Sequence, residues 1–226
     1  SRKMKSEEID QFVQAHGFEP TAIGVALDSL AVYVHKDNPL ESLSLPQVDG
    51  IFSQTRALGG TEIATWGQAG LTGAWAERPL SLYGRNSASG TYGFFKEEAL
   101  GKGDYKDSVK EQPGSASVVM GVSNDLGGIG YSGIGYKTSG VKAISLAEEA
   151  GGTAYEPNYE NVLTGSYPLS RMLYVYIAKK SGDSADKLTS EFLKLVLSKE
   201  GQAIVEKDGY MPLTPELIEQ QLAILN

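Results

Sequence analysis

Strand-like and helix-like segments alternate along the whole chain, and this alternation constrains the fold more than any other feature of the sequence. Apolar residues alternate from Pro20 to His35, and the segment 169–179 is rich in Tyr, Val and Ile, as strands are. Apolar residues at helical spacing follow Ser6, fill 44–52 and fill 189–198. The sequence therefore predicts an α/β fold.

Capping and breaking residues predict where some of these elements end. Ser6 precedes two glutamates and Gly17 ends the apolar pattern, so a short helix is expected between them. The strand-like alternation from Pro20 to His35 continues across a break at Asp28-Ser29, so one long extended segment is expected there. Gly201 is expected to end the last of the three helical segments.

The composition excludes several kinds of function. Because the chain has no cysteine, thiol catalysis, disulfides and thiolate metal sites are all excluded. A net charge of −8 argues against a nucleic-acid surface, which relies on clustered Lys and Arg, but it does not exclude a small anion held by aimed N–H groups. No apolar run approaches the roughly 20 residues of a membrane helix, so the chain is not expected to span a membrane.

The segment Arg85-Asn86-Ser87-Ala88-Ser89-Gly90-Thr91 is the strongest local signal for a binding site. A strand is expected at 79–83 and a helix at 92–100, so the segment leads from a strand into the head of a helix. The first N–H groups of a helix lack partners within it and attract anions. The segment adds two hydroxyls and the planar, permanently charged guanidinium of Arg85. Ordinary capping of a helix by Ser and Thr explains the same residues and stays open as an alternative.

Three further motifs do not predict a site. The segment 128–133 fits G-x-G-x-x-G, but no helix former follows it, so a glycine-rich strand is favoured over a dinucleotide site. The segment 139–142 fits S-x-x-K without the partner motifs of penicillin-recognising enzymes. The two histidines, His16 and His35, lack the spacing of metal ligands. We therefore expect neither a metal nor a cofactor.

Six segments in a specific order carry a family resemblance. They are Ser1-Arg2-Lys3-Met4, 45–52 with Trp66, 85–91, 128–131, 167–171, and 198–202 with 209–213. On these segments the chain resembles, nearly end to end, the periplasmic phosphate-binding proteins of ABC-type phosphate importers. In that family Trp66 would belong to an exposed Trp-Gly pair, and 85–91 would be the ligand loop.

The resemblance implies a two-lobed, type II periplasmic-binding-protein fold. The first lobe would comprise 1–27 and 168–226, and the second lobe 28–167. The first lobe would be incomplete at its N-terminus, because family members have several dozen further residues that include a serine-bearing phosphate loop. If that part is missing, we expect weak phosphate binding or none, and submicromolar binding by the 226 residues would contradict this.

The resemblance also implies a function and a set of ligand residues. The protein would bind inorganic phosphate outside the cytoplasmic membrane, in the periplasm or secreted, and deliver it to the permease subunits of an ABC transporter. The implied phosphate ligands are Arg85, Ser87, Ser89, Gly90 and Thr91 in the second lobe, with Ser1 and Arg2 at the edge of the cleft. Some family members carry Asp at the positions of Arg2 and Ser87, where a carboxylate accepts a hydrogen bond from protonated phosphate and so rejects sulfate, which has no proton to donate near neutral pH. Here that discrimination must come from elsewhere.

Two other functions stay open on the sequence. An enzyme could use the serine-rich loop, but no histidine lies near it, and Glu97 and Glu98 fall beyond the first helical turn. We therefore expect no catalysis. A secreted adhesion or matrix protein could keep the same fold without binding phosphate, because fold alone does not fix function.

Overall fold

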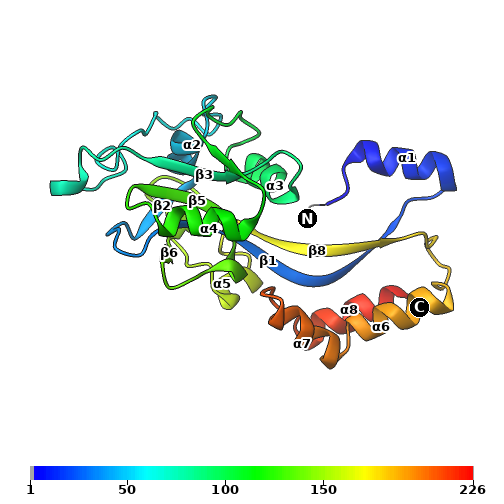
Figure 1. Cartoon of the computed structure of the whole chain (residues 1–226). Coiled ribbons are helices and arrows are strands. Elements are labelled where there is room, and N and C mark those ends of the chain that lie inside the picture. Colours follow the sequence, from blue (N-terminus) through cyan, green and yellow to red (C-terminus); the bar gives the residue numbers. More distant parts are fainter. Residues whose placement is uncertain (1–2, 226) are drawn as a thin grey trace. The chain divides into compact units, whose positions relative to one another are not determined.

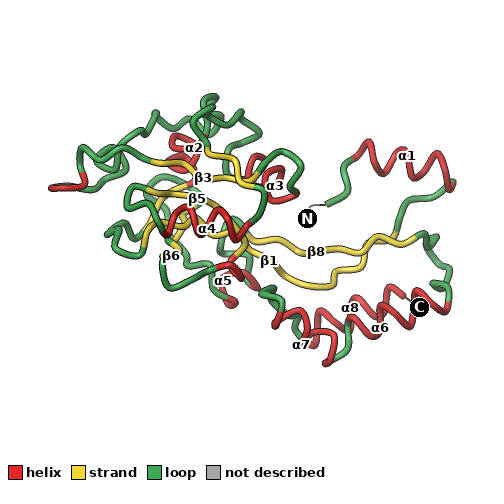
Figure 2. Tube along the Cα trace, viewed as in Figure 1, coloured by secondary structure: helices red, strands yellow, loops and turns green. Residues whose placement is uncertain are grey.

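The structure is a computed structural model that describes residues 3–225 (Figure 1). The chain divides into two compact units, a larger unit of residues 29–170 and a smaller unit of residues 3–28 and 171–225. Helices and strands alternate through much of the chain (Figure 2), and the predicted α/β class is confirmed. The strands β1 and β8 both contain a boundary between the two units.

The helices and strands have the following bounds. The helices are α1 (Ser6–His16), α2 (Leu45–Phe52), α3 (Gly90–Glu98), α4 (Ser115–Ser123), α5 (Tyr159–Leu163), α6 (Lys187–Val196), α7 (Lys199–Lys207) and α8 (Pro215–Leu225), with short 3-10 turns at Gly73–Trp75 and Ile134–Tyr136. The strands are β1 (Thr21–His35), β2 (Ser42–Ser44), β3 (Ser81–Arg85), β4 (Lys110–Gln112), β5 (Gly128–Gly133), β6 (Val141–Ala143), β7 (Ser145–Ala147) and β8 (Ser170–Ile177).

The larger unit is built on a mixed sheet in the order β4-β3-β5-β1-β6. Strand β3 runs parallel to β4 and β5, whereas β1 runs antiparallel to β5 and β6. Helix α4 covers one face, where Val119 and Val122 pack against Tyr33. On the other face Phe52 of α2 and Phe95 of α3 pack against Tyr131. Because β3 and β4 pair in parallel, their ends lie side by side, with α4 on one face of the sheet and α2 and α3 on the other.

Strand β1 is continuous from Thr21 to His35, so the predicted long extended segment is confirmed and the break in its apolar alternation at Asp28-Ser29 does not interrupt it. The Arg171 side chain donates to Oδ2 of Asp28 from Nε at 2.9 Å and from Nη2 at 2.6 Å. On either side of Asp28, the Leu27 N–H donates to the Met211 carbonyl and the Leu30 N–H donates to the Leu169 carbonyl. A polar residue does not interrupt a strand when its charge and its neighbours' backbone groups all find partners.

Gly201 lies inside α7, so the prediction that a helix ends at this residue is wrong. Helix α6 ends at Val196, and Ser198 caps α7 by accepting a hydrogen bond from the Gly201 N–H at 3.2 Å. A Cβ atom at position 201 would collide with the backbone oxygens of Leu195 and Val196. The glycine is therefore needed for the close turn between α6 and α7, which its position in the sequence does not distinguish from a helix stop.

Trp66, which the resemblance assigned to an exposed pair, is fully buried. The Trp66 ring meets that of Trp75 edge to face at 6.1 Å, and the backbone N–H of Trp66 donates to the Arg78 carbonyl at 3.0 Å. The turn that contains Trp75 folds over the ring. This contact between residues nine positions apart cannot be read from a Trp-Gly pair alone.

The smaller unit pairs β8 with β1 and packs α6, α7 and α8 as its C-terminal helices (Figure 1). Its buried apolar residues include Ile23, Leu193 and Leu213. A set of large apolar residues on α6 and α7 is nevertheless exposed: Leu188 (81%), Phe192 (56%), Leu195 (61%) and Ile204 (67%). Leu188, Phe192 and Leu195 fall at helical spacing, so α6 presents one apolar face to solvent.

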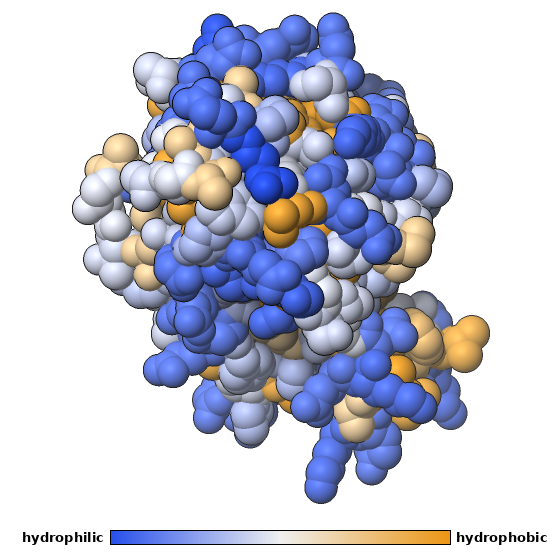
Figure 3. All heavy atoms as spheres, turned by 60° about the vertical axis from the view of Figure 1, so that its left-hand side comes forward, coloured by the Kyte–Doolittle hydropathy of each residue, from blue (hydrophilic) through white to orange (hydrophobic). Residues whose placement is uncertain are grey.

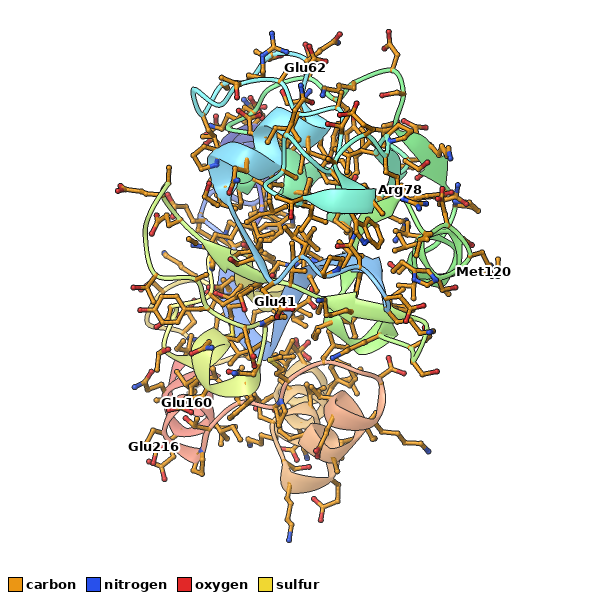
Figure 4. All side chains as sticks on the ribbon, turned by 90° about the vertical axis from the view of Figure 1, so that its left-hand side faces the viewer. Glu41, Glu62, Arg78, Met120, Glu160 and Glu216 are labelled. Carbon is orange, nitrogen blue, oxygen red and sulfur yellow. The ribbon has the colours of Figure 1, made fainter. Side chains whose placement is uncertain are left out.

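The view in Figure 3 is mostly hydrophilic, with apolar residues in small groups. On α4, Met120 points away from the sheet and is 61% exposed (Figure 4). Within residues 3–225, no helix is both long enough and apolar enough to cross a membrane. The described residues also contain no group of three or more His, Cys, Asp or Glu placed to hold a metal ion.

Candidate functional site

The segment 85–91, which we call the ligand segment, joins the end of β3 to the first turn of α3. Its turn is held by two backbone hydrogen bonds: the Asn86 N–H donates to the Gln112 carbonyl at 3.3 Å, and the Ser89 N–H donates to the Asn86 carbonyl at 3.1 Å. Ser87 lies at the tip and is exposed. The segment therefore leads from the end of β3, beside the end of β4, to the head of α3, with its tip at the protein surface.

Helix α3 begins at Gly90, two residues earlier than predicted, because Ser89 caps it. The Ser89 Oγ accepts a hydrogen bond from the Thr91 N–H at 3.1 Å. The first bond within the helix runs from the Gly93 N–H to the Ser89 carbonyl at 3.2 Å. The N–H groups of Gly90 and Tyr92 thus have no partner inside the helix. Capping and anion binding are compatible here, because the Ser89 hydroxyl keeps its own hydrogen for donation.

The guanidinium of Arg85 extends toward the start of α4. Its Nη1 donates to the Ser115 Oγ at 2.9 Å, and its Nη2 donates to the Pro113 carbonyl at 3.3 Å. Its Nε is buried and has no hydrogen-bond partner in the described structure. A guanidinium carries five N–H donors, so three remain after these two bonds. Arg85 is therefore anchored at the head of a second helix and still has donors for an anion.

A group of aromatic rings lies beneath the ligand segment. The Tyr131 ring is fully buried and stacks on Phe95 with centroids 3.8 Å apart and an interplanar angle of 6°. Tyr105 lies between Tyr92 and Tyr131, with ring centroids at 4.5 and 6.0 Å respectively. Burial raises the pKa of Tyr131 to about 12 and also raises that of Tyr105. Both phenols are therefore neutral near pH 7 and act as hydrogen-bond donors.

A cavity of about 380 Å³ borders the ligand segment in the larger unit. Its lining residues are Arg85, Tyr92, Asp104, Tyr105, Lys106, Asp107, Val109 and Glu111. Three carboxylates face two cations in this lining. The cavity is therefore not itself a favourable place for a multiply charged anion, and binding of an anion at the head of α3 stays a prediction.

The structure brings five of the predicted ligand residues together in one turn: Arg85, Ser87, Ser89, Gly90 and Thr91. The other two, Ser1 and Arg2, lie outside the described residues. Sequence reasoning missed the residues that support the turn, Ser115, Tyr105 and Tyr131. Tyr131 gives a weak signal, since it is a lone aromatic residue in a glycine-rich strand, whereas Ser115 and Tyr105 give none.

The remaining motifs occupy ordinary structural positions. The G-x-G-x-x-G match forms β5, so the predicted glycine-rich strand is confirmed. In the S-x-x-K match, Lys142 belongs to β6 and its Nζ lies 3.0 Å from the carboxylate of Glu41. His16 ends α1, where its ring stacks on Phe12 at 4.2 Å. The Nδ1 of His35 accepts a hydrogen bond from the Asp37 N–H at 3.2 Å.

Comparison with known proteins gives one family match and several similar proteins. The model of the PBP superfamily domain matches residues 1–200. A phosphate-binding protein PstS from Pseudomonas aeruginosa strain PAO1 is 56% identical over 223 residues, which is 98% of this chain and 69% of the relative.

Two solved structures are similar over most of the chain. A putative phosphate ABC transporter substrate-binding protein from Clostridium perfringens, solved with bound phosphate, has a TM-score of 0.71 and 26% identity. The match covers 95% of this chain and 77% of that one. An ABC-type phosphate transport receptor from Vibrio cholerae has a TM-score of 0.72 and 22% identity, covering 94% and 78% of the two chains. At that identity the second structure supports the fold alone.

Proposed function

Because the chain belongs to the PBP superfamily and to its PstS-like phosphate-binding proteins, we propose that it binds inorganic phosphate outside the cytoplasmic membrane and delivers it to an ABC transporter. The observation that carries the proposal is the ligand segment, where an anchored arginine meets the capped head of α3. The comparisons support this function and give no support to the adhesion alternative.

The phosphate would be held by groups that differ in charge and flexibility. The N–H groups at the head of α3 supply fixed dipoles, and the hydroxyls of Ser89 and Thr91 supply short-range donors. Arg85 supplies the positive charge, and its bonds to Ser115 and Pro113 fix the plane of the guanidinium. A tetrahedral oxyanion matches such a set, because its oxygens point in several directions at once.

Several features support binding without catalysis. The relatives are named for binding or transport of phosphate. The acids nearest to the ligand segment along α3, Glu97 and Glu98, belong to its last turn and their residues are exposed. A phosphoryl or acyl transfer would need a base within hydrogen-bond reach of the reacting group. We therefore assign no reaction to the site.

We further propose that the larger unit is the second lobe and that the smaller unit belongs to the first lobe. The predicted boundaries, 27/28 and 167/168, fall within three residues of the boundaries between the units, 28/29 and 170/171. The smaller unit leaves the apolar face of α6 exposed, whereas a soluble helix normally buries such a face. The chain spans 69% of the length of the Pseudomonas relative.

Titration of the 226-residue chain with phosphate tests the binding role. Amide resonances of 86–92 should shift in ¹H–¹⁵N spectra, which detect weak as well as tight binding. A melting experiment measures the same event, since a ligand at 100 times its dissociation constant stabilises a protein by about 2.7 kcal/mol. Sulfate and arsenate serve as parallel arms, and the sulfate arm measures how far the chain discriminates without the family's two carboxylates.

Two variants test whether phosphate binds at the ligand segment. Arg85→Ala should abolish the phosphate-dependent shifts and the rise in melting temperature. Lys142→Ala is the matched control, because it also removes one cation from the larger unit, from an ion pair with the exposed Glu41 (Figure 4). An undiminished effect in Arg85→Ala contradicts the proposal, and an absence of any phosphate effect in the unmodified chain means that these 226 residues do not bind phosphate by themselves.

Delivery to the transporter needs a separate measurement. Cells that lack the gene should take up less radiolabelled phosphate, and the gene should restore uptake. The Arg85→Ala gene should fail to restore it despite normal protein levels. Normal uptake in the deleted strain would remove the transport role and leave binding to be explained in another way.

A further inference from the structure

Two tyrosine hydroxyls connect Arg85, at the start of the ligand segment, to Tyr92, the residue that follows it. The backbone N–H of Arg85 donates to the Tyr131 Oη at 3.3 Å, and the Tyr131 hydroxyl donates to the Tyr105 Oη at 3.0 Å. The Tyr105 hydroxyl then donates to the carbonyl of Tyr92 at 2.9 Å. Arg85 ends β3 and Tyr92 lies in the first turn of α3, so an unbroken chain of hydrogen bonds spans the turn from below.

The three hydrogen bonds of this connection all run in the same direction. Each hydroxyl accepts one hydrogen bond and donates one, and the donors all point from β3 toward α3. Hydrogen bonds arranged in series polarise one another and strengthen in a buried setting. Loss of either hydroxyl therefore interrupts the whole connection.

The rings that carry the hydroxyls have little freedom to move. Tyr131 is clamped by Phe95, stacked at 3.8 Å, and by Phe52, which meets it edge to face at 5.8 Å. Tyr105 is held between Tyr92 and Tyr131. The positions of the two oxygens are thus set by the core of the larger unit and not by the exposed turn.

Gly84 makes the connection possible. A Cβ atom at this position would lie 3.0 Å from the Cε1 and 3.1 Å from the Oη of Tyr131, and 2.9 Å from the Cγ1 of Val109. These distances are too short for an ordinary side-chain contact. The glycine in β3 therefore lets the phenol approach the strand and reach the N–H of the next residue, as expected for a strand glycine at a close contact.

We propose that Tyr131 and Tyr105 are positioning residues for the anion site. Their hydroxyls fix the separation between the end of β3 and the first turn of α3, and so hold the N–H groups at the head of α3 in place before the anion arrives. Preorganised donors bind more tightly than donors that must be ordered on binding. This inference rests on the proposed function, because it takes inorganic phosphate as the anion.

Tyr83, which lies on β3 with Arg85, provides a matched control. Tyr83 also donates a hydrogen bond from its hydroxyl, to the Asp125 Oδ2 at 2.9 Å, but its ring faces α4 on the opposite side of the sheet. Because the hydroxyl also accepts a hydrogen bond from the Lys110 Nζ at 3.2 Å, Tyr83→Phe removes a hydroxyl and two hydrogen bonds two residues before Arg85 without touching the connection. If the hydroxyls had a purely structural role, the variants at 83, 105 and 131 would show the same changes in amide exchange and in phosphate affinity.

The experiment compares Tyr105→Phe, Tyr131→Phe and Tyr83→Phe with the unmodified chain in two measurements. Without ligand, amide hydrogen exchange at 86–92 should speed up in the first two variants and stay unchanged in the third. In phosphate titrations the first two variants should bind about fivefold more weakly, the equivalent of one net hydrogen bond, while Tyr83→Phe stays within about twofold. Melting temperatures measured without phosphate separate affinity from stability.

The outcomes are distinguishable. If the unmodified chain shows no response to phosphate, phosphate binding by these 226 residues fails, and the positioning role fails with it. If it responds and the variants at 105 and 131 bind as tightly as it does, the positioning role fails while the function stands. Unchanged exchange at 86–92, or an equal loss of affinity in Tyr83→Phe, also overturns the positioning role. Should Tyr131→Phe fold poorly, Tyr105→Phe decides the matter, because Tyr105 is only partly buried.

Discussion

Separating the buried ion pair between Asp28 and Arg171 should destabilise the smaller unit strongly. The two side chains are only 5% and 9% exposed, and the guanidinium makes two hydrogen bonds to one carboxylate oxygen. Removing one partner leaves a buried charge without its opposite, which typically costs about 3–5 kcal/mol. We expect Asp28→Asn near the low end, because the amide keeps an acceptor oxygen, and Arg171→Met near the high end.

The double variant separates charge burial from packing. If the pair is coupled, Asp28→Asn combined with Arg171→Met should cost far less than the sum of the two single variants, because no uncompensated charge remains. Glu191→Gln is the matched control in the same unit, since Glu191 pairs with Lys194 at 2.9 Å with both side chains about half exposed. An exposed pair of this kind should contribute less than about 1 kcal/mol.

Urea unfolding followed by two probes measures these effects. Circular dichroism reports the helices of both units, whereas both tryptophans, Trp66 and Trp75, belong to the larger unit and report that unit by fluorescence. The Asp28 and Arg171 variants should shift the dichroism transition at least as much as the fluorescence transition. A single-variant cost below about 1 kcal/mol, or a double variant equal to the sum of the singles, would refute the reasoning.

Three further predictions follow from particular contacts. Gly84→Ala should weaken phosphate binding and cost about 1–3 kcal/mol by overpacking against Tyr131, and unchanged binding in titrations would contradict this. Asp125 should stabilise the fold above its unfolded pKa of about 3.9 and lose that contribution as pH falls through its folded pKa. Burial alone would raise that pKa, but hydrogen bonds from Ser81, Tyr83 and the Gly127 N–H, together with the charge of Lys110, outweigh burial and lower it. Asp125→Asn should flatten the acid limb of stability against pH, and an unaltered limb would show that other groups control it. Leu188→Gln with Phe192→Gln should change the stability of the 226-residue chain by less than about 1 kcal/mol and reduce self-association in sedimentation, whereas a large loss of stability would mean that α6 buries this face.

The sequence by itself determined the class of the fold and the place of the ligand segment. Alternating apolar patterns reflect which side of a strand or helix is buried, so β1, α2 and β8 were predictable within a few residues. The segment 85–91 was predictable because small polar residues between a strand and a helix expose N–H groups. Both signals come from residues that are close together in the sequence, so they do not depend on how the helices and strands pack against one another.

Only the tertiary structure decided what supports those elements. Asp28 continues a strand because Arg171, 143 positions away, neutralises it, and Gly201 belongs inside α7 because two carbonyls crowd it. Tyr131 and Tyr105 reach the ligand segment through contacts between β5, the loop before β4 and α3. No local pattern encodes such contacts, because their free energy depends on partners that are distant in the chain and meet only when the core is formed.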